Sequence, residues 1–185
     1  LKYRDEKTAI IHRDESGNSY SLSYNSLYLE VARVVRGLRK LGVTKGDRVA
    51  GFVTNIPEAI IYMLATTSIG AIWSSTSPDF GFEGVMDRFG QIKPKVLVAV
   101  NGYTYNGKDY DSREKLEKIV ESIDSLEKVV ILEKIEADSY EGEKFTTDTE
   151  LKNNNAKEIE FEQLPFDHPV YIMYSSGTTG VPKCI

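Results

Sequence analysis

Several residue types and patterns that define whole classes of protein are scarce in this sequence. It has one cysteine, Cys184, among 185 residues, so the chain forms no internal disulfide and a reducing compartment, the cytoplasm, is expected. Of its two histidines, His12 has no acid or nucleophile near it, and His168 is expected to be structural. No metal ligands are assigned. No apolar run approaches the roughly 18 residues of a membrane helix, so no membrane span is expected.

The sequence also has no excess of positive charge. Its 23 lysines and arginines are outnumbered by 28 aspartates and glutamates, which gives a net charge of −5. Nucleic-acid binding needs a basic face, so we expect no nucleic-acid partner. The hydrophobic fraction of 41% is that of an ordinary globular domain, and the chain is long enough to bury one sizeable core.

What the sequence does contain is an alternation of apolar runs and helical patterns. Turn residues at 14–18 predict a hairpin, and Ser23 is expected to cap a helix that Gly42 ends. Further strands are expected at 48–53, from residue 71, at 95–100 and at 128–132. Helices are expected near 56–69 and at 82–91. A third helix is expected after a capping box at 111–114, in which Asp111 is the cap. Residues 101–108 are expected to form a loop, and 134–162 a solvated excursion with a short helix near 147–152. This order predicts an α/β fold: a multilayer, largely parallel, doubly wound sheet flanked by helices.

The last twelve residues, 174–185, carry the densest chemistry. An apolar run at 170–174 predicts a buried strand that leads into them. Two glycines, Gly177 and Gly180, let the backbone turn so that its N–H groups converge on an anion. Four hydroxyl side chains and one lysine add donors and a positive charge: Ser175, Ser176, Thr178, Thr179 and Lys183. A strand followed by such a loop predicts an oligophosphate site.

Two other interpretations of this loop fit the residues less well. A Walker phosphate loop ends in Gly-Lys-Ser/Thr, whereas here Pro182 precedes Lys183, Cys184 follows it, and the hydroxyls lie before the lysine. A flexible Ser/Gly-rich linker has no reason to carry Pro-Lys at this offset. The residues therefore indicate a phosphate-binding loop of another kind.

The segment Tyr174-Ser-Ser-Gly-Thr-Thr-Gly-Val-Pro-Lys183 resembles the signature of the adenylate-forming enzymes, which include acyl-CoA synthetases, peptide-synthetase adenylation domains and luciferases. The resemblance implies that a carboxylate is activated with ATP and Mg²⁺ as an acyl-adenylate, that pyrophosphate leaves, and that the acyl group passes to a thiol, usually that of CoA. The resemblance extends over most of the chain, and Gly46-Asp-Arg-Val49 before a strand is part of it.

Within this superfamily the sequence is similar to acetoacetyl-CoA synthetases. The similarity is carried by Gly70-Ala-Ile-Trp-Ser-Ser-Thr-Ser-Pro-Asp-Phe-Gly81, by Asp87-Arg-Phe89 with Gln91-Ile92, and by Lys183-Cys184. Acetate and propionate activators usually show His-Ser-Val-Val where this chain has Trp73-Ser-Ser-Thr76. The resemblance implies a ligase of fatty-acid and lipid metabolism that acts on acetoacetate. Another short-chain acyl-CoA synthetase, an adenylating enzyme with a different acceptor, and a non-catalytic ATP-binding module stay open as alternatives.

The resemblance also implies residue roles. Ser175, Ser176, Gly177, Thr178, Thr179 and Gly180 would hold the ATP phosphates, Lys183 would offset the charge of the leaving pyrophosphate, and Lys183 and Thr178 would be the catalytic residues. Ser77, Pro78 and Asp79 would lie along the CoA channel. The alternative for this second segment is a tight turn in which Asp79 caps the next helix.

The two ends of the sequence suggest a piece of a larger enzyme. The first residue is Leu, and the sequence stops two residues after Lys183. We expect residues 1–185 to be a partial N-terminal AMP-binding domain, without the rest of that domain and the C-terminal domain, and to be inactive alone. The acyl pocket and the oligomeric state are not predicted from these residues.

Overall fold

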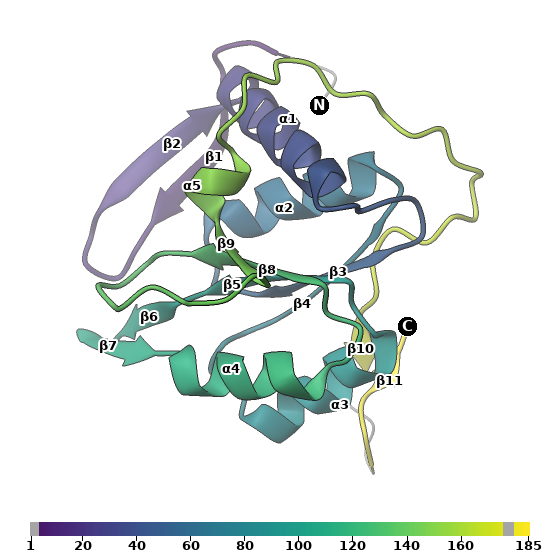
Figure 1. Ribbon diagram of the computed structural model, residues 1–185. Coiled ribbons are helices and arrows are strands. Elements are labelled where there is room, and N and C mark those ends of the chain that lie inside the picture. The colour runs from purple at the N-terminus through teal and green to yellow at the C-terminus, as the bar shows by residue number, and fades with distance from the viewer. Residues whose placement is uncertain (1–3, 176–179) are drawn as a thin grey trace.

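The computed structural model describes residues 4–175 and 180–185. Its centre is a parallel sheet between two layers of helices (Figure 1). Helices α1 (Tyr24–Lys40) and α2 (Pro57–Ser68) cover one face, and α3 (Phe82–Ile92) and α4 (Arg113–Ser122) cover the other. The α/β fold expected from the sequence is therefore confirmed.

The sheet has five parallel strands in the order β4-β3-β5-β8-β9. Their bounds are Ile72–Thr76 for β4, Arg48–Phe52 for β3, Val96–Val100 for β5, Lys128–Leu132 for β8 and Phe145–Thr147 for β9. The chain runs from β3 out to β4 and then returns to the other side of β3, which is the doubly wound order. All five carboxyl ends consequently lie at one edge.

Side chains of the central strands alternate between two cores, as the pleat requires. Val96, Val98 and Val100 of β5 pack under α1 and α2, whereas Leu97 and Ala99 pack against α3 and α4. Gly51 of β3 is required by the close approach of β4, because a Cβ there would lie 2.5 Å from the Trp73 ring.

Three expected features of the first half are confirmed. Strands β1 (Thr8–Arg13) and β2 (Ser19–Ser23) form an antiparallel hairpin. The Ser23 hydroxyl accepts a hydrogen bond from Ser26 N at 3.1 Å and so caps α1. Gly42 follows the C-terminus of α1 with φ of +80°, a conformation that favours glycine.

The segment expected to be a loop at 101–108 is a second hairpin, so that prediction was wrong. Strands β6 (Gly102–Tyr105) and β7 (Lys108–Asp111) pair antiparallel. Asn106 and Gly107 connect them with φ of +52° and +71°. Asn-Gly is the preferred pair for such a two-residue turn, so the signal for this hairpin was present in the sequence.

The expected cap of α4 is displaced by one residue. Ser112, not Asp111, is the N-cap, and its side chain makes no capping hydrogen bond. The Asp111 carboxylate still accepts from Arg113 N at 2.7 Å. The carboxylate therefore satisfies one free N–H of the first turn from a position outside the helix.

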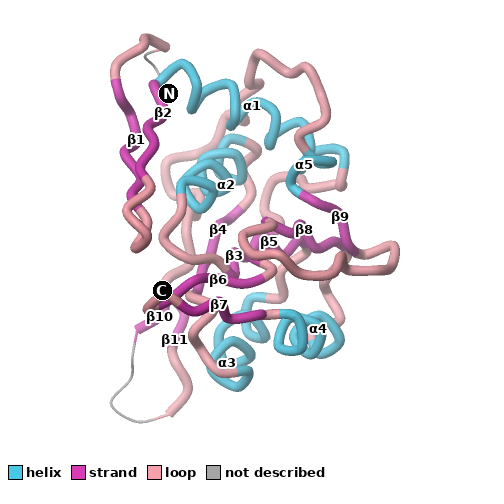
Figure 2. Tube along the Cα trace, turned by 90° about the vertical axis from the view of Figure 1, so that its left-hand side faces the viewer, coloured by secondary structure: helices cyan, strands magenta, loops and turns pink. Residues whose placement is uncertain are grey.

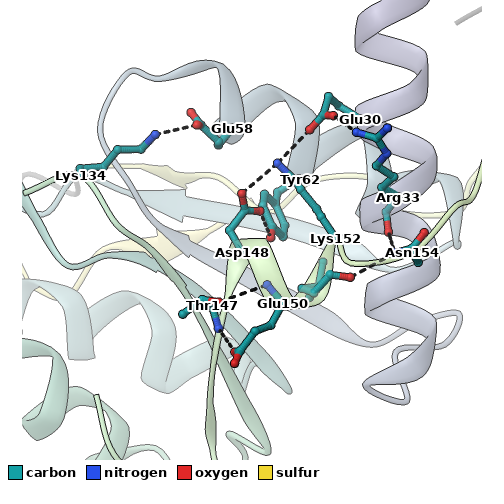
Figure 3. Close-up of polar contacts among 11 residues, drawn as sticks. Glu30, Arg33, Glu58, Tyr62, Lys134, Thr147, Asp148, Glu150, Lys152 and Asn154 are labelled. Carbon is teal, nitrogen blue, oxygen red and sulfur yellow. Dashed lines mark hydrogen bonds and ion pairs between the residues drawn. The ribbon is translucent and has the colours of Figure 1, made fainter. Parts of the chain in front are cut away.

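The short helix expected near 147–152 is present as α5 (Asp148–Leu151), with Thr147 and Glu150 forming a capping box. Half-buried charged side chains join it to the helical layer (Figure 3). Lys152 Nζ lies 2.9 Å from Asp148 Oδ2 and 3.1 Å from Glu30 Oε2, and the Tyr62 hydroxyl donates to Asp148 at 2.7 Å. This Lys152 cluster, made of Glu30, Tyr62, Asp148 and Lys152, connects α1, α2 and α5.

Among the described residues, no helix is both long enough and apolar enough to cross a membrane.

Candidate active site

The polar segments singled out in the sequence meet at the carboxyl edge of the sheet. Residues that follow β3 and β4 there face the chain segment 171–174 across an open hollow of about 610 Å³. The lining consists of Val53, Thr54, Asn55, Ala59, Ser75, Thr76, Ser77, Phe80, Arg88, Tyr171, Met173 and Tyr174. Ligands of doubly wound sheets bind at this edge, so the hollow lies where the fold predicts a site.

The apolar run at 170–174 lies beside the edge strand β4, but it is not the buried strand that was predicted. One bridge pairs Tyr171 with Trp73 in parallel, Trp73 N donates to Val170 O at 3.1 Å, and Ile172 N donates to Trp73 O at 2.8 Å. Val170 is 55% exposed and Met173 58%. β4 pairs with one flank of this segment through Val170 and Ile172, and the other flank is paired only at its end, where Met173 meets Ile185 in the described part of the chain.

Hydroxyl groups of β4 hold this segment in place. Ser74 is fully buried, and its hydroxyl donates to Ile172 O at 2.9 Å and lies 3.0 Å from the Tyr174 hydroxyl. The Ser75 and Tyr171 hydroxyls are 2.6 Å apart. These contacts are a structural reason for hydroxyl residues in the Trp73–Thr76 segment, and the sequence analysis did not find their tyrosine partners.

The base of the phosphate loop is a short antiparallel ladder. Strand β10 (Tyr174–Ser175) pairs with β11 (Lys183–Cys184), and Ser175 stands opposite Lys183. Met173 and Ile185 exchange two backbone hydrogen bonds, of 3.0 and 2.9 Å, below this ladder. The ladder lies beside α3 in both views (Figures 1 and 2). It brings the first loop hydroxyl and the lysine side by side, which suits an anion.

The structure places the predicted loop residues only in part. Lys183 is exposed, Ser175 is half-buried, and Gly180 is exposed with φ of +98°. Ser176, Gly177, Thr178 and Thr179 lie outside the described residues. Their roles as phosphate ligands, and that of Thr178 in catalysis, remain predictions.

The segment 77–79, predicted to line a CoA channel, is a turn closed by a 3.3 Å hydrogen bond from Phe80 N to Ser77 O. Ser77 lines the hollow, Pro78 is buried and Asp79 is exposed. Lys115 Nζ donates to Pro78 O at 2.7 Å and so fixes the turn. Asp79 does not cap α3, whose N-cap is Gly81 without a side-chain hydrogen bond, so the capping alternative was wrong.

One polar group at the hollow has no partner. Thr76 is 8% exposed, and its hydroxyl finds no hydrogen bond among the residues that the structure describes. A buried hydroxyl without a partner carries a free-energy cost. A ligand in the hollow could therefore gain a hydrogen bond from Thr76 at little expense.

Two of the titratable side chains that line the hollow near the loop are an uncharged tyrosine and an arginine. Burial raises the pKa of Tyr174 to about 12, so this phenol stays protonated at neutral pH. Arg88 of α3 lines the hollow and lies over the Phe80 ring, 4.4 Å from its centroid. His168 is structural, as expected: its Nε2 lies 2.9 Å from Gly70 O.

Comparison with known proteins identifies the family of the chain. The family described as AMP-binding enzyme matches residues 2–185. The chain belongs to the AMP-binding enzyme family.

Individual curated proteins match all or nearly all of the chain. It is 44% identical to the acetoacetyl-CoA synthetase of Macaca fascicularis, over 100% of the chain and 29% of that protein. It is 46% identical to the acetoacetyl-coenzyme A synthetase of Rhizobium meliloti (strain 1021), over 96% of the chain and 28% of that protein. A malonamoyl-CoA synthetase of Penicillium aethiopicum is 38% identical over 98% of this chain and 26% of that protein.

A solved structure shares the fold. The acetoacetyl-CoA synthetase from Streptomyces lividans superimposes with a TM-score of 0.91 at 39% identity, covering 98% of this chain and 27% of that one. This chain therefore spans less than a third of the length of the relatives that it matches. The resemblance recognised in the sequence is confirmed.

Proposed function

We propose that this chain is a partial N-terminal domain of an ATP-dependent acyl-CoA synthetase, and that the acid is acetoacetate. The enzyme would form an acyl-adenylate with release of pyrophosphate and then transfer the acyl group to the thiol of CoA. The observation that carries the proposal is the position of Lys183, opposite Ser175 at the base of the glycine- and hydroxyl-rich loop. The same ladder contains Tyr174, which lines the hollow at the carboxyl edge. Relatives named acetoacetyl-CoA synthetase support the choice of acid.

In the proposed reaction the carboxylate attacks the α-phosphorus and pyrophosphate leaves. Little covalent work falls to the protein, so positioning and charge stabilisation dominate. The loop 175–180 would hold the β- and γ-phosphates, and the Lys183 ammonium would offset the charge that develops on the leaving group. Charge-assisted hydrogen bonds of this kind contribute about 1.5–3 kcal/mol each.

Magnesium would enter with the nucleotide. Among the described residues, no group of three or more His, Cys, Asp and Glu side chains could hold a metal ion. Mg²⁺ commonly binds through substrate phosphates and retains several waters. We therefore treat the ion as part of the ATP substrate and assign it no ligand in this chain.

The CoA part of the proposal rests on the turn at 77–79. Ser77 and Thr76 line the hollow, and the Thr76 hydroxyl is buried without a partner among the described residues, so a chain of amide groups such as that of CoA that reached it would find a hydrogen-bonding partner. We propose the cytoplasm as the location, since the single cysteine fits a reducing compartment.

The decisive test is pyrophosphate release by the full-length enzyme. It should be measured with acetate, propionate, butyrate, malonamate and acetoacetate, each with and without CoA. We expect the highest kcat/KM with acetoacetate and formation of the acyl-CoA only when CoA is present. A preference for another acid would overturn the choice of substrate, and ATP binding without turnover of any acid would favour a non-catalytic module.

A further inference from the structure

Helix α3 contacts both limbs of the phosphate loop, although it contributes no residue to the loop itself. Near its middle, Arg88 lies over the ring of Tyr174, 5.7 Å from the centroid, and Tyr174 is the last residue before the loop hydroxyls. At its end, Gln91 Nε2 donates a hydrogen bond of 2.8 Å to Pro182 O, next to Lys183. We propose that Gln91 is a positioning residue that sets the direction of the Lys183 side chain. This inference rests on the proposed function.

A single carboxamide holds both neighbours of the lysine. The nitrogen of Gln91 donates to Pro182 O, and its oxygen lies 3.7 Å from Cys184 Sγ, where it accepts from the thiol. The same nitrogen also donates to Asp87 O, one turn back in the helix. Gln91 therefore anchors the residue before Lys183 and the residue after it, without contacting the Lys183 side chain itself.

The strand geometry then determines where Lys183 points. Successive side chains in a strand project to opposite faces. Since Cys184 is turned towards Gln91 on α3, Lys183 and its ladder partner Ser175 project to the opposite face. A rotation of this short strand would carry the ammonium group away from Ser175, and the contact with Gln91 opposes that rotation.

The helix is itself a rigid support. Arg48, the first residue of β3, closes its C-terminus: Nε donates to Ile92 O at 2.8 Å and Nη2 to Lys93 O at 2.9 Å. These bonds satisfy carbonyls that have no partner within the helix. The position of Gln91 is therefore determined by the central sheet, and the sheet is connected to Lys183 through Arg48, α3 and Gln91.

The test uses ATP–pyrophosphate exchange by the full-length enzyme carrying Gln91→Ala or Gln91→Glu. Glutamate keeps the length and the acceptor oxygen but loses the donor to Pro182. A small misplacement of a charged group weakens the binding that depends on it, so we expect the KM for ATP to rise roughly three- to tenfold in both variants. The KM for the carboxylate and the melting temperature should change little. Gly90→Ala is the control, because a Cβ there meets only the end of the Met86 side chain at 3.7 Å.

Three kinetic results would overturn the proposal: a KM for ATP within twofold of wild type in both variants, an equal rise in Gly90→Ala, or a rise in both KM values together with a lower melting temperature. Hydrogen exchange without any substrate provides an independent readout. Backbone amides of 183–185 should exchange faster in Gln91→Ala than in wild type, and unchanged exchange would reject the anchoring. If the wild-type enzyme catalyses no exchange with any acid, the proposed function fails, and hydrogen exchange still decides the role of Gln91.

Discussion

Lys183 and Ser175 show how single residues prepare a site for an anion. The ladder places them opposite each other, and both are accessible to solvent. A lysine ammonium is a compact charge with three donors, so its effect depends on being held close to the phosphates. The Thr76 hydroxyl of the hollow is buried and has no partner among the described residues. Lys183 leads to a prediction about ATP, and Thr76 leads to a separate prediction about CoA.

Lys183→Ala in the full-length enzyme should slow the adenylation half-reaction more than tenfold, because the charge that offsets the leaving pyrophosphate is lost. ATP–pyrophosphate exchange measures this step directly. Lys118→Ala is a matched control on α4, where Lys118 forms an exposed pair with Glu114, and it should keep the wild-type rate. Exchange at the wild-type rate in Lys183→Ala would reject the role assigned to the lysine.

Thr76→Val in the full-length enzyme tests whether the unpartnered hydroxyl serves a ligand. Removing it should raise the free energy of unfolding by about 1 kcal/mol, since valine needs no hydrogen bond, and should raise the KM for CoA. Thr66→Val is the control, because the Thr66 hydroxyl is also buried and without a partner in the described structure, but lies on α2 and does not line the hollow. It should stabilise the protein without changing this KM. Equal KM values in both variants and wild type would show that Thr76 does not contact CoA.

At the scale of elements, the Lys152 cluster shows why a helix of only four residues is stable in this position. Lys152 is 15% exposed at its side chain, and its partners Asp148 and Glu30 are 22% and 26% exposed. Burial lowers the pKa of Lys152, but the carboxylates of Asp148 and Glu30 raise it by a larger amount. The net pKa therefore lies above the ordinary value. The amine therefore stays charged, and the helix is bound to α1 and α2 by charge as well as by its capping box.

Lys152→Met should lower the free energy of unfolding of the full-length enzyme by about 1–3 kcal/mol, because Asp148 loses its cation while Glu30 keeps its ion pair with Arg33. Urea unfolding followed by circular dichroism measures this change. The exposed pair Lys118–Glu114 provides the comparison, and Lys118→Met should change the free energy of unfolding far less, because an exposed ion pair contributes little to stability. Similar losses in the two variants would contradict the importance given to burial.

At the scale of the whole molecule, ion pairs connect the polar segment 134–162 to the helical layer. Lys134 Nζ lies 2.6 Å from Glu58 Oε1, between the end of β8 and the start of α2 (Figure 3). Burial raises the pKa of Glu58, but Lys134, the Glu58 backbone N–H and Lys152 together lower it by more, so the net pKa is below its ordinary value of 4.5. A carboxyl group with a lowered pKa stabilises the folded state above its unfolded pKa, and this contribution is lost as the pH falls through the folded value.

Lys134→Met should therefore have a pH-dependent cost in the full-length enzyme. At pH 7 the variant leaves Glu58 charged and largely buried without a cation, which destabilises the fold. Without Lys134, burial is opposed only by the weaker effects of the backbone N–H and Lys152, so the pKa of Glu58 is higher than in wild type. Acid then neutralises the group and relieves part of the penalty. The difference in free energy of unfolding between wild type and variant should be smaller at pH 4 than at pH 7. A difference that is constant or larger at pH 4 would show that the pair does not act in this way.

The sequence by itself determined the order of most elements and the glycine- and hydroxyl-rich motif that ends in Lys183, because both depend on local patterns. Hydrophobic periodicity locates helices and strands, and the spacing of Gly177, Gly180 and Lys183 is a property of a short segment. The signal for the hairpin at Asn106-Gly107 was also local, since Asn-Gly is the preferred pair for a two-residue turn.

Only the tertiary structure decided which distant residues meet. The hydroxyls of Ser74 and Ser75 approach tyrosines 96 or more positions away, and Gln91 reaches Pro182 across 91 positions. The exposure of the 170–174 run was also outside the reach of sequence, since an apolar run is buried only where another element covers it. Local periodicity carries no information about such neighbours, because the pairing of strands and the docking of helices on the sheet determine them.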